Sequence, residues 1–254
     1  MAVQTKKNPV GLAGFDRAPT ERIHRLIVSL TADWKKGKTT FALTAPAPIA
    51  LIDMDTGLEG VIEKWAKVKE IHVKSFNYHD ATNEDEWREM WEDCKKAFIG
   101  ALENPRIKTV IWDTATEAFE LIRMARFGKL NKVVMAGGKA VPYPWGPVNT
   151  EFRDLLRKSL GTRKNVIFVH KTKDEYLNDE RTGNRIRAGF GDMEFVTQVN
   201  ILLWKDMDKG GYGLTLESCR QNSDVDGLEL VEPLNTFSQV ATLIFPETSE
   251  EDWE

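Results

Sequence analysis

Short apolar runs alternate with segments of helical periodicity along the first two thirds of the chain. The apolar runs predict strands at residues 25–30, 49–53, 71–76, 108–114 and 165–170. Continuous apolar runs are typical of parallel strands buried on both faces. Helical spacing predicts helices at 39–44, 58–67, 84–102, 117–127 and 147–160. This alternation favours an α/β fold with a mostly parallel, twisted sheet flanked by helices and joined by right-handed crossovers.

The last third of the chain follows a different pattern. Residues 199–204 and 212–219 predict an antiparallel hairpin at the edge of the sheet, and residues 237–244 predict a last helix. We interpret the chain as an N-terminal arm at 1–22, one domain at 23–245 and an acidic C-terminal tail at 246–254. The tail carries one aromatic residue, Trp253, and its charge favours a disordered, solubilising end.

Composition narrows the class of protein. The 254 residues suffice for one large α/β domain, and 41% hydrophobic residues support a sizeable core. The net charge of −4 gives no global basic field, and Cys94 and Cys219 lie too far apart for a metal or redox motif. The sequence has no apolar stretch of about 18 residues and no apolar signal segment, so we expect a cytoplasmic protein without a membrane partner.

The richest chemistry lies directly after the first predicted strand. Residues 32–40 read Ala-Asp-Trp-Lys-Lys-Gly-Lys-Thr-Thr and lead into a predicted helix, which is the context of a phosphate-binding loop. Gly37 allows close approach of a phosphate, Lys38 can reach the β- and γ-phosphates, and Thr39 can bind Mg²⁺. Ala32 stands where the pattern usually has a glycine with positive φ. The expected nucleotide-binding residues are Ala32, Asp33, Trp34, Lys35, Lys36, Gly37, Lys38, Thr39 and Thr40; the alternative is an ordinary surface loop.

Other candidate residues stand at strand ends. Asp113 is suited to Mg²⁺, or it could cap the following helix. Asp53 and Asp55 follow the second strand, where one could hold the attacking water while the alternative is helix capping. His170 could sense the γ-phosphate or be structural, and Arg220 could be an arginine finger for a neighbouring subunit or a solvated side chain. Zinc-protease, Cys/His-cluster and Gly-x-Ser-x-Gly motifs do not occur in the sequence.

Two segments, 128–145 and 171–192, have no clear period and are expected to be long loops, which are usually functional or disordered. Lysine and arginine can neutralise phosphates, and the nearby Tyr143 and Trp145 can stack on unpaired bases. Acidic neighbours weaken the charge argument in the second segment, and a solvated surface is the alternative. The candidate DNA-binding residues are Lys129, Lys132, Lys139, Lys171, Lys173, Arg181, Arg185 and Arg187.

The four strand-end motifs together resemble the RecA-like ATPases, in particular the small phage-encoded type linked to single-strand annealing recombination. The resemblance covers about residues 24–220 and rests on Gly37-Lys38-Thr39-Thr40, Leu51-Ile52-Asp53-Met54-Asp55, Val110-Ile111-Trp112-Asp113 and Val166-Ile167-Phe168-Val169-His170. It implies a RecA-like P-loop core in which the His170 strand separates the phosphate-loop strand from the Asp113 strand. It further implies that Asp55 is the catalytic carboxylate, His170 the sensor and Arg220 a finger across a subunit interface.

The resemblance also implies a function. We expect an ATP- and Mg²⁺-binding ATPase that is stimulated by single-stranded DNA, forms a ring or filament, and acts in phage recombination or replication within the host cytoplasm. The acidic tail could then recruit a replication or recombination protein. Because Ala32 and the short Asp55 depart from the family pattern, a nucleotide-gated annealing or loading protein with little hydrolysis is an alternative, as is a hexameric helicase-like relative.

Overall fold

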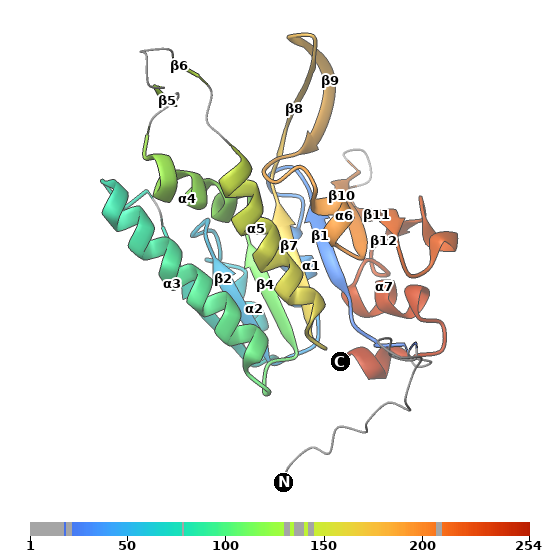
Figure 1. Ribbon diagram of the computed structural model, residues 1–254. Coiled ribbons are helices and arrows are strands. Elements are labelled where there is room, and N and C mark those ends of the chain that lie inside the picture. Colours follow the sequence, from blue (N-terminus) through green and yellow to red (C-terminus); the bar gives the residue numbers. More distant parts are fainter. Residues whose placement is uncertain are drawn as a thin grey trace.

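The computed structural model describes residues 18, 22–77, 79–129, 133–134, 140–141, 145–206 and 210–254, so the predicted N-terminal arm lies almost wholly outside the described residues. A sheet with the order β12-β11-β10-β1-β7-β4-β2-β3 crosses the molecule (Figure 1). Its strands are β1 (Ile27–Thr31), β2 (Ile49–Asp53), β3 (Ile71–Ser75), β4 (Thr109–Asp113), β7 (Asn165–His170), β10 (Val199–Lys205), β11 (Tyr212–Cys219) and β12 (Glu229–Val231).

The six strands from β10 to β3 are parallel, and β11 and β12 continue the sheet in antiparallel pairing. The predicted α/β class and the antiparallel hairpin at the sheet edge are therefore confirmed. Strand β7 lies between β1 and β4, as the RecA-like P-loop core requires. Because the strands are parallel, the ends of β1, β2, β4 and β7 meet at one edge of the sheet, where ligands of such sheets bind.

Helices cover both faces of the sheet (Figure 1). One face packs on α3 (Glu84–Glu103), α4 (Ala115–Phe127), α5 (Trp145–Leu160) and the short α6 (Met193–Val196). The other face packs on α1 (Lys38–Leu43), α7 (Phe237–Ile244) and the short α2 (Ile62–Trp65). The molecule is thus a three-layer sandwich with one apolar core on each side of the sheet.

Strand β7 shows how the sequence builds both cores. Val166 and Phe168 pack with the α3–α5 layer, whereas Ile167 and Val169 pack with the α1–α7 layer. Successive side chains of a strand point to opposite faces, so an unbroken apolar run fills both layers at once. Every residue of β7 is buried, which agrees with the prediction from its apolar run.

The segment 171–192, expected to be a long loop, contains a β-hairpin instead. Strands β8 (Thr172–Leu177) and β9 (Glu180–Arg187) pair antiparallel and project beyond the carboxyl ends of the sheet (Figure 1). The turn residues Asn178 and Asp179 have φ of 52° and 65°, the positive values that a tight two-residue hairpin turn requires. Most side chains of the hairpin are exposed, so it has no apolar period to reveal it. In segment 128–145 the structure describes a small pair, β5 (Val133–Val134) and β6 (Ala140–Val141).

The acidic tail folds back onto the domain, contrary to the expected disordered end. Its last residues form a 3-10 turn, η2 (Glu250–Trp253), and Trp253 is only 3% exposed. The indole stacks on Phe245 at 5.5 Å between ring centroids and also contacts Phe237 of α7. A buried indole cannot serve as the exposed tip of a recruiting tail. In the described part of the chain no helix is long and apolar enough to cross a membrane.

Candidate nucleotide-binding site

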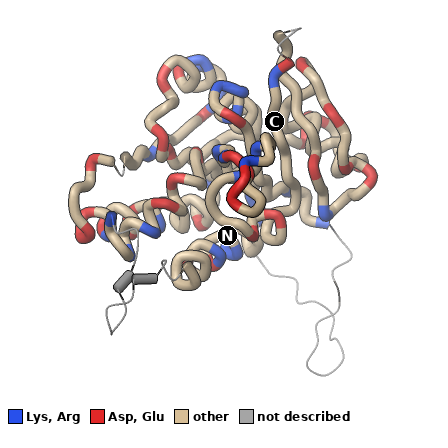
Figure 2. Tube along the Cα trace, turned by 90° about the horizontal axis from the view of Figure 1, so that it is seen from above, with Lys and Arg blue, Asp and Glu red and all other residues tan. Residues whose placement is uncertain are grey.

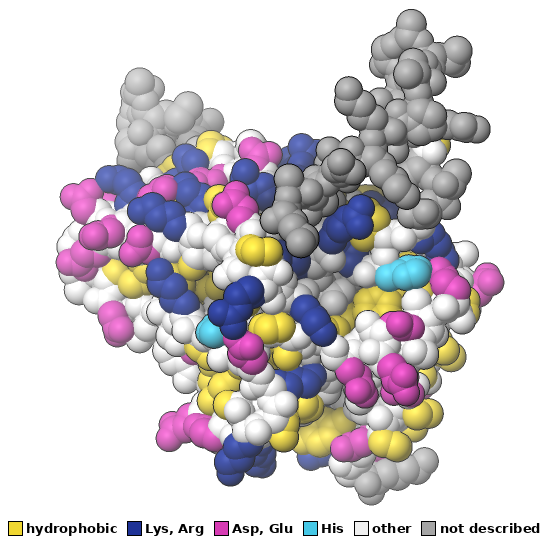
Figure 3. All heavy atoms as spheres, turned by 90° about the horizontal axis from the view of Figure 1, so that it is seen from below, with side chains coloured by type: hydrophobic (Ala, Val, Ile, Leu, Met, Phe, Trp, Pro, Cys, Tyr) yellow, Lys and Arg dark blue, Asp and Glu magenta, His cyan; other side chains and the backbone are white. Residues whose placement is uncertain are grey.

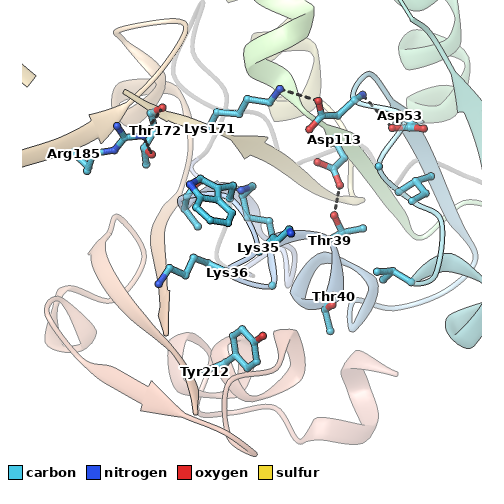
Figure 4. Close-up of a pocket in the computed structure, with 18 residues that line it drawn as sticks. Lys35, Lys36, Thr39, Thr40, Asp53, Asp113, Lys171, Thr172, Arg185 and Tyr212 are labelled. Atoms are coloured by element: carbon cyan, nitrogen blue, oxygen red, sulfur yellow. Dashed lines mark hydrogen bonds and ion pairs between the residues drawn. The ribbon is translucent and has the colours of Figure 1, made fainter. Parts of the chain in front are cut away.

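A cavity of about 700 Å³ opens at the carboxyl ends of the parallel strands, around the loop that joins β1 to α1 (Figure 4). The loop turns through Lys35 at φ 57° and Gly37 at φ 84°, and Gly37 directly precedes α1. A Cβ at Gly37 would lie 3.6 Å from the ring of Tyr212, which forms the far wall. The loop, with its backbone turned to the cavity at a helix start, has the form of an anion-binding site.

The conformation of Ala32 explains why this loop does not need a glycine at its first position. It is fully buried, and its φ is not positive, so a Cβ is tolerated there. The Nζ of Lys38 donates to the carbonyl oxygens of Ala32 at 3.1 Å and Asp33 at 2.8 Å. Burial lowers the pKa of Lys38, although Asp113 and Asp55 oppose that shift. The ammonium therefore rests on backbone oxygens inside the cavity, where phosphate oxygens would replace them.

Asp113 ends β4 beside the loop and contacts its threonine. Thr39 Oγ1 donates to Asp113 Oδ2 at 2.6 Å, as Figure 4 shows. Burial raises the pKa of Asp113 to about 6, against the opposing effects of Thr39 and Lys38. The capping alternative is wrong, because the side chain that caps α4 is Thr114, which accepts from the N–H of Glu117. A hydroxyl and a buried carboxylate side by side are the oxygen ligands that Mg²⁺ prefers, so these residues fit the ion.

The two aspartates after β2 have different surroundings. Asp53 accepts hydrogen bonds from the N–H groups of Asp55 and Thr56 and from the hydroxyl of Ser75, so it holds the turn that follows the strand. Asp55 is half exposed and its carboxylate faces the cavity, where Lys171 Nζ lies at 2.8 Å. Of the two, Asp55 is therefore the one in a position to act on a bound phosphate.

The β8–β9 hairpin is tied to the cavity at its base. Asp33 of the phosphate loop accepts from the hydroxyl of Thr172 and, at 3.1 Å, from Nε of Arg185. The Thr172 hydrogen bond is the main reason that the pKa of Asp33 is lowered. Lys171 and Arg185, both expected to bind DNA, line the nucleotide cavity instead (Figure 4). Their placement follows from the hairpin, which brings both ends of segment 171–187 back to the edge of the sheet.

A family model described as an AAA domain, AAA_24, matches residues 24–222. The chain belongs to this family. No curated protein matches it. Among solved structures, a RadB recombinase shares 13% identity over 81% of this chain and 86% of that chain, with a TM-score of 0.49. A KaiC-like protein from the archaeon Pyrococcus horikoshii shares 16% identity over 81% of this chain and 84% of that chain, with a TM-score of 0.42.

In this AAA-domain chain His170 does not lie where a direct phosphate sensor would. Its side chain is fully buried and is not part of the cavity wall. Strand alternation places it on the same side as Val166 and Phe168, away from α1. Burial, followed by the charge of Arg187, holds the pKa of His170 well below its usual range, so the ring is neutral. Within the described structure neither ring nitrogen has a hydrogen-bond partner.

Arg220 lies at the opposite edge of the sheet from the cavity. It follows β11, which runs antiparallel, and its Nη2 donates to the carbonyl oxygen of Phe195 at 2.5 Å. The side chain therefore cannot reach the nucleotide cavity of its own chain, and a role at a neighbouring subunit stays a prediction.

The other candidate DNA-binding residues are scattered. On the hairpin Arg181 pairs with Asp174 at 2.6 Å and Arg187 with Glu194 at 3.1 Å, while Lys173 has no carboxylate partner among the described residues. Lys129 lies over the ring of Trp87, and Lys132 and Lys139 lie outside the described residues. Lysine and arginine are interspersed with aspartate and glutamate, both along the chain trace seen from above in Figure 2 and on the face seen from below in Figure 3.

Sequence reasoning missed three residues of the site. Glu117 lies in the first turn of α4, and its carboxylate is 2.6 Å from Lys171 Nζ. The spacing Thr114-x-x-Glu117 is typical of a helix start. In the sequence it therefore indicates helix capping and not the ion pair that Glu117 makes with Lys171. Thr172 and Tyr212 carry no motif at all, and only the pairing of β8 with β9 and of β10 with β11 brings them to the loop.

Proposed function

We propose that this chain is a Mg²⁺-dependent ATPase that single-stranded DNA stimulates. One observation carries the proposal: Lys38, Thr39, Asp113 and Asp55 line the same cavity. The projecting β8–β9 hairpin is also hydrogen-bonded to the phosphate loop of that cavity. Family membership supports the ATPase part, since these residues are the ones that P-loop ATPases use. The DNA part rests on the projecting hairpin and on the resemblance of the motif order to the RecA-like proteins.

Each residue has a role that its surroundings suit. The backbone of the loop and the Nζ of Lys38 bind the phosphates, and Lys38 gives up the carbonyls of Ala32 and Asp33 to do so. Thr39 and Asp113 would hold Mg²⁺, which neutralises charge on the phosphates when bound. Asp55 orients the attacking water beside Lys171, which holds one of its two carboxylate oxygens.

Slow hydrolysis without DNA follows from the pairing of Asp55. Lys171 Nζ donates to Asp55 Oδ1 at 2.8 Å, which engages one carboxylate oxygen and fixes the carboxylate toward the ammonium rather than toward a water molecule. Lys171 immediately precedes β8, so a change at the hairpin can move it away from Asp55. This pairing supports the second candidate, a nucleotide-gated annealing or loading protein, if nothing moves Lys171 during the reaction.

We extend the proposal to assembly and biological role. A ring or filament would bring Arg220, at the far edge of the sheet, to a neighbour's nucleotide. Recombination or replication of a phage within its host's cytoplasm is the setting that the motif order suggests. Partner recruitment through Trp253 is no longer part of the proposal, because that side chain is buried.

ATP hydrolysis should be measured with and without a single-stranded oligonucleotide. We expect stimulation by DNA, loss of hydrolysis in Lys38→Ala, and loss of hydrolysis but not of nucleotide binding in Asp55→Asn. The matched control is Lys67→Ala, which removes an exposed lysine that lines neither cavity and should retain activity. Nucleotide binding that is absent, or hydrolysis that survives Lys38→Ala, would refute the proposal. Hydrolysis that DNA leaves unchanged would favour the second candidate.

A further inference from the structure

A second cavity, of about 760 Å³, lies beside the base of the hairpin. Its walls come from the first turns of α4 and α5, from the hairpin, and from the chain that leads from β9 to α6. The lining residues are Thr116, Glu117, Phe119, Glu120, Trp145, Asn149, Lys173, Gly189 and Gly191. They come from both segments that the sequence singled out and from the helix that follows Asp113.

The walls of this cavity combine a flat aromatic surface with polar groups. Trp145 is 40% exposed and stacks on Phe119, with 5.7 Å between the ring centroids and 9° between the planes. The buried Phe119 thus fixes the plane of the indole. Asn149 brings an amide, Glu117 and Glu120 bring carboxylates, and Lys173 brings an ammonium. A planar ligand with hydrogen-bond donors and acceptors on its edge matches this combination.

The charges decide between candidate ligands. Both lining carboxylates already pair with a cation of the chain, Glu117 with Lys171 and Glu120 with Arg123. Among the lining residues this leaves Lys173 as the cation for a phosphate, and the polar walls disfavour a purely apolar ligand. A nucleobase has both a face that stacks on an aromatic ring and amino or imino donors that carboxylates accept. Lys173 is exposed and, unlike the other hairpin cations, has no carboxylate partner in the described structure, so it can take the adjoining phosphate.

We propose that this cavity binds one unpaired nucleobase of single-stranded DNA, stacked on Trp145. This inference deepens the proposed function and rests on it, since it names the group through which DNA is recognised. Because stacking does not depend on base identity, the site binds strands of any sequence. A stacked base also requires an unpaired strand, so duplex DNA is a poor ligand.

The base cavity shares Glu117 with the nucleotide cavity. Glu117 lines the base cavity, and its Oε1 accepts from Lys171 Nζ at 2.6 Å. Lys171 in turn donates to Asp55 Oδ1 at 2.8 Å. A base that donates to Glu117 competes with Lys171 for that carboxylate and so changes which oxygens hold the ammonium that also pairs with Asp55. Binding at the second cavity thereby reaches the carboxylate that we assign to the attacking water.

Abasic DNA provides the test. Fluorescence anisotropy compares a labelled 20-nucleotide strand with a deoxyribose-phosphate strand of the same length, at fixed salt, for the full chain. One stacked base predicts a preference for the base-bearing strand of about 5- to 100-fold. Trp145→Leu should remove most of that preference, and Trp145→Phe should keep much of it. Phe195→Leu is the matched control, since Phe195 is 77% exposed on α6 and lines neither cavity, and it should keep the full preference.

Nucleotide binding, measured in parallel with a fluorescent ATP analogue, separates this inference from the proposed function. Trp145→Leu should bind the analogue as the parent chain does, which also shows that the variant is folded. Equal binding of the abasic and base-bearing strands by the parent chain, a preference that survives Trp145→Leu, or equal loss in Phe195→Leu would each overturn the base site. Failure to bind the analogue at all would instead overturn the proposed ATPase.

Discussion

Replacing Asp113 by asparagine should make the metal-free protein more stable at neutral pH. Burial raises the pKa of this carboxyl from 3.8 to about 6. The folded state therefore holds the proton more tightly than the unfolded state does, so the free energy of unfolding falls as pH rises from about 4 to about 6. At about 1.4 kcal/mol per pKa unit, the ionised carboxylate costs about 3 kcal/mol above pH 6.

The amide introduced by this substitution would keep the shape of the side chain and an oxygen that accepts from the Thr39 hydroxyl. The variant Asp113→Asn should thus gain about 3 kcal/mol at pH 7.5, but only about half as much at pH 5, where the folded carboxyl is largely protonated already. The measurement is urea unfolding followed by circular dichroism, in EDTA and without nucleotide. Comparison of parent and variant at each pH removes the contributions of all other titrating groups.

Asp53→Asn is the matched control, because Asp53 stands beside Asp113 in the paired strands β2 and β4. Its Oδ1 accepts from two N–H groups and its Oδ2 from the Ser75 hydroxyl. An amide can keep the two N–H bonds and donate to the Ser75 oxygen, so this variant should gain much less stability than Asp113→Asn at pH 7.5. The reasoning fails if Asp113→Asn lowers stability at pH 7.5, or if its gain is the same at pH 5.

Three further predictions follow from single contacts. Trp253→Ala should lower the free energy of unfolding in urea by about 3–5 kcal/mol, because it leaves a cavity at a buried site. Trp34→Ala, at a residue 77% exposed, should lower it almost not at all, and equal effects of the two substitutions would contradict the packing of the tail. His170→Leu should raise stability by about 1–3 kcal/mol by removing unpaired buried nitrogens; a loss of stability would show that the ring is hydrogen-bonded. Asp33→Asn should speed amide hydrogen exchange in segment 172–187 by up to about tenfold without changing α3, and unchanged exchange would refute the tie at the base of the hairpin.

The strands and helices of the sheet could be predicted because their side chains pack on apolar layers. The apolar runs of β1, β2, β4 and β7 and the buried stripe of α3 at Trp87, Trp91, Cys94 and Phe98 all produce a visible period. The β8–β9 hairpin is different, since it projects from the sheet and has no face to bury. Its one local signal is the Asn178-Asp179 turn, which suits positive φ but does not fix the pairing.

The residues of the candidate site likewise fall into those that buried strands position and those that depend on contacts between distant segments. Residues 32–40, Asp55 and Asp113 lie at the end of buried strands, so sequence order alone places them at one edge of a parallel sheet. Glu117, Thr172 and Tyr212 depend on how segments distant in sequence meet. His170 shows a limit of strand-end reasoning, because a strand end fixes the position of the backbone but alternation decides which face the side chain enters.

The hairpin is basic in sequence, yet most of its cations pair with carboxylates of the same chain. Lys171, Arg181, Arg185 and Arg187 each pair with a carboxylate of the chain. Phosphate binding by such a hairpin must break those pairs, which removes much of the gain that counterion release would give. In the function proposed above, contacts to bases therefore add affinity that the paired cations do not supply, and the cavity that Trp145 and Phe119 line is the place proposed for them. The pairs with Asp33 of the phosphate loop and with Asp55 after β2 join the base of the hairpin to the nucleotide cavity. In the function proposed above, a strand bound beside the hairpin and a nucleotide bound in the cavity would therefore act on the same side chains.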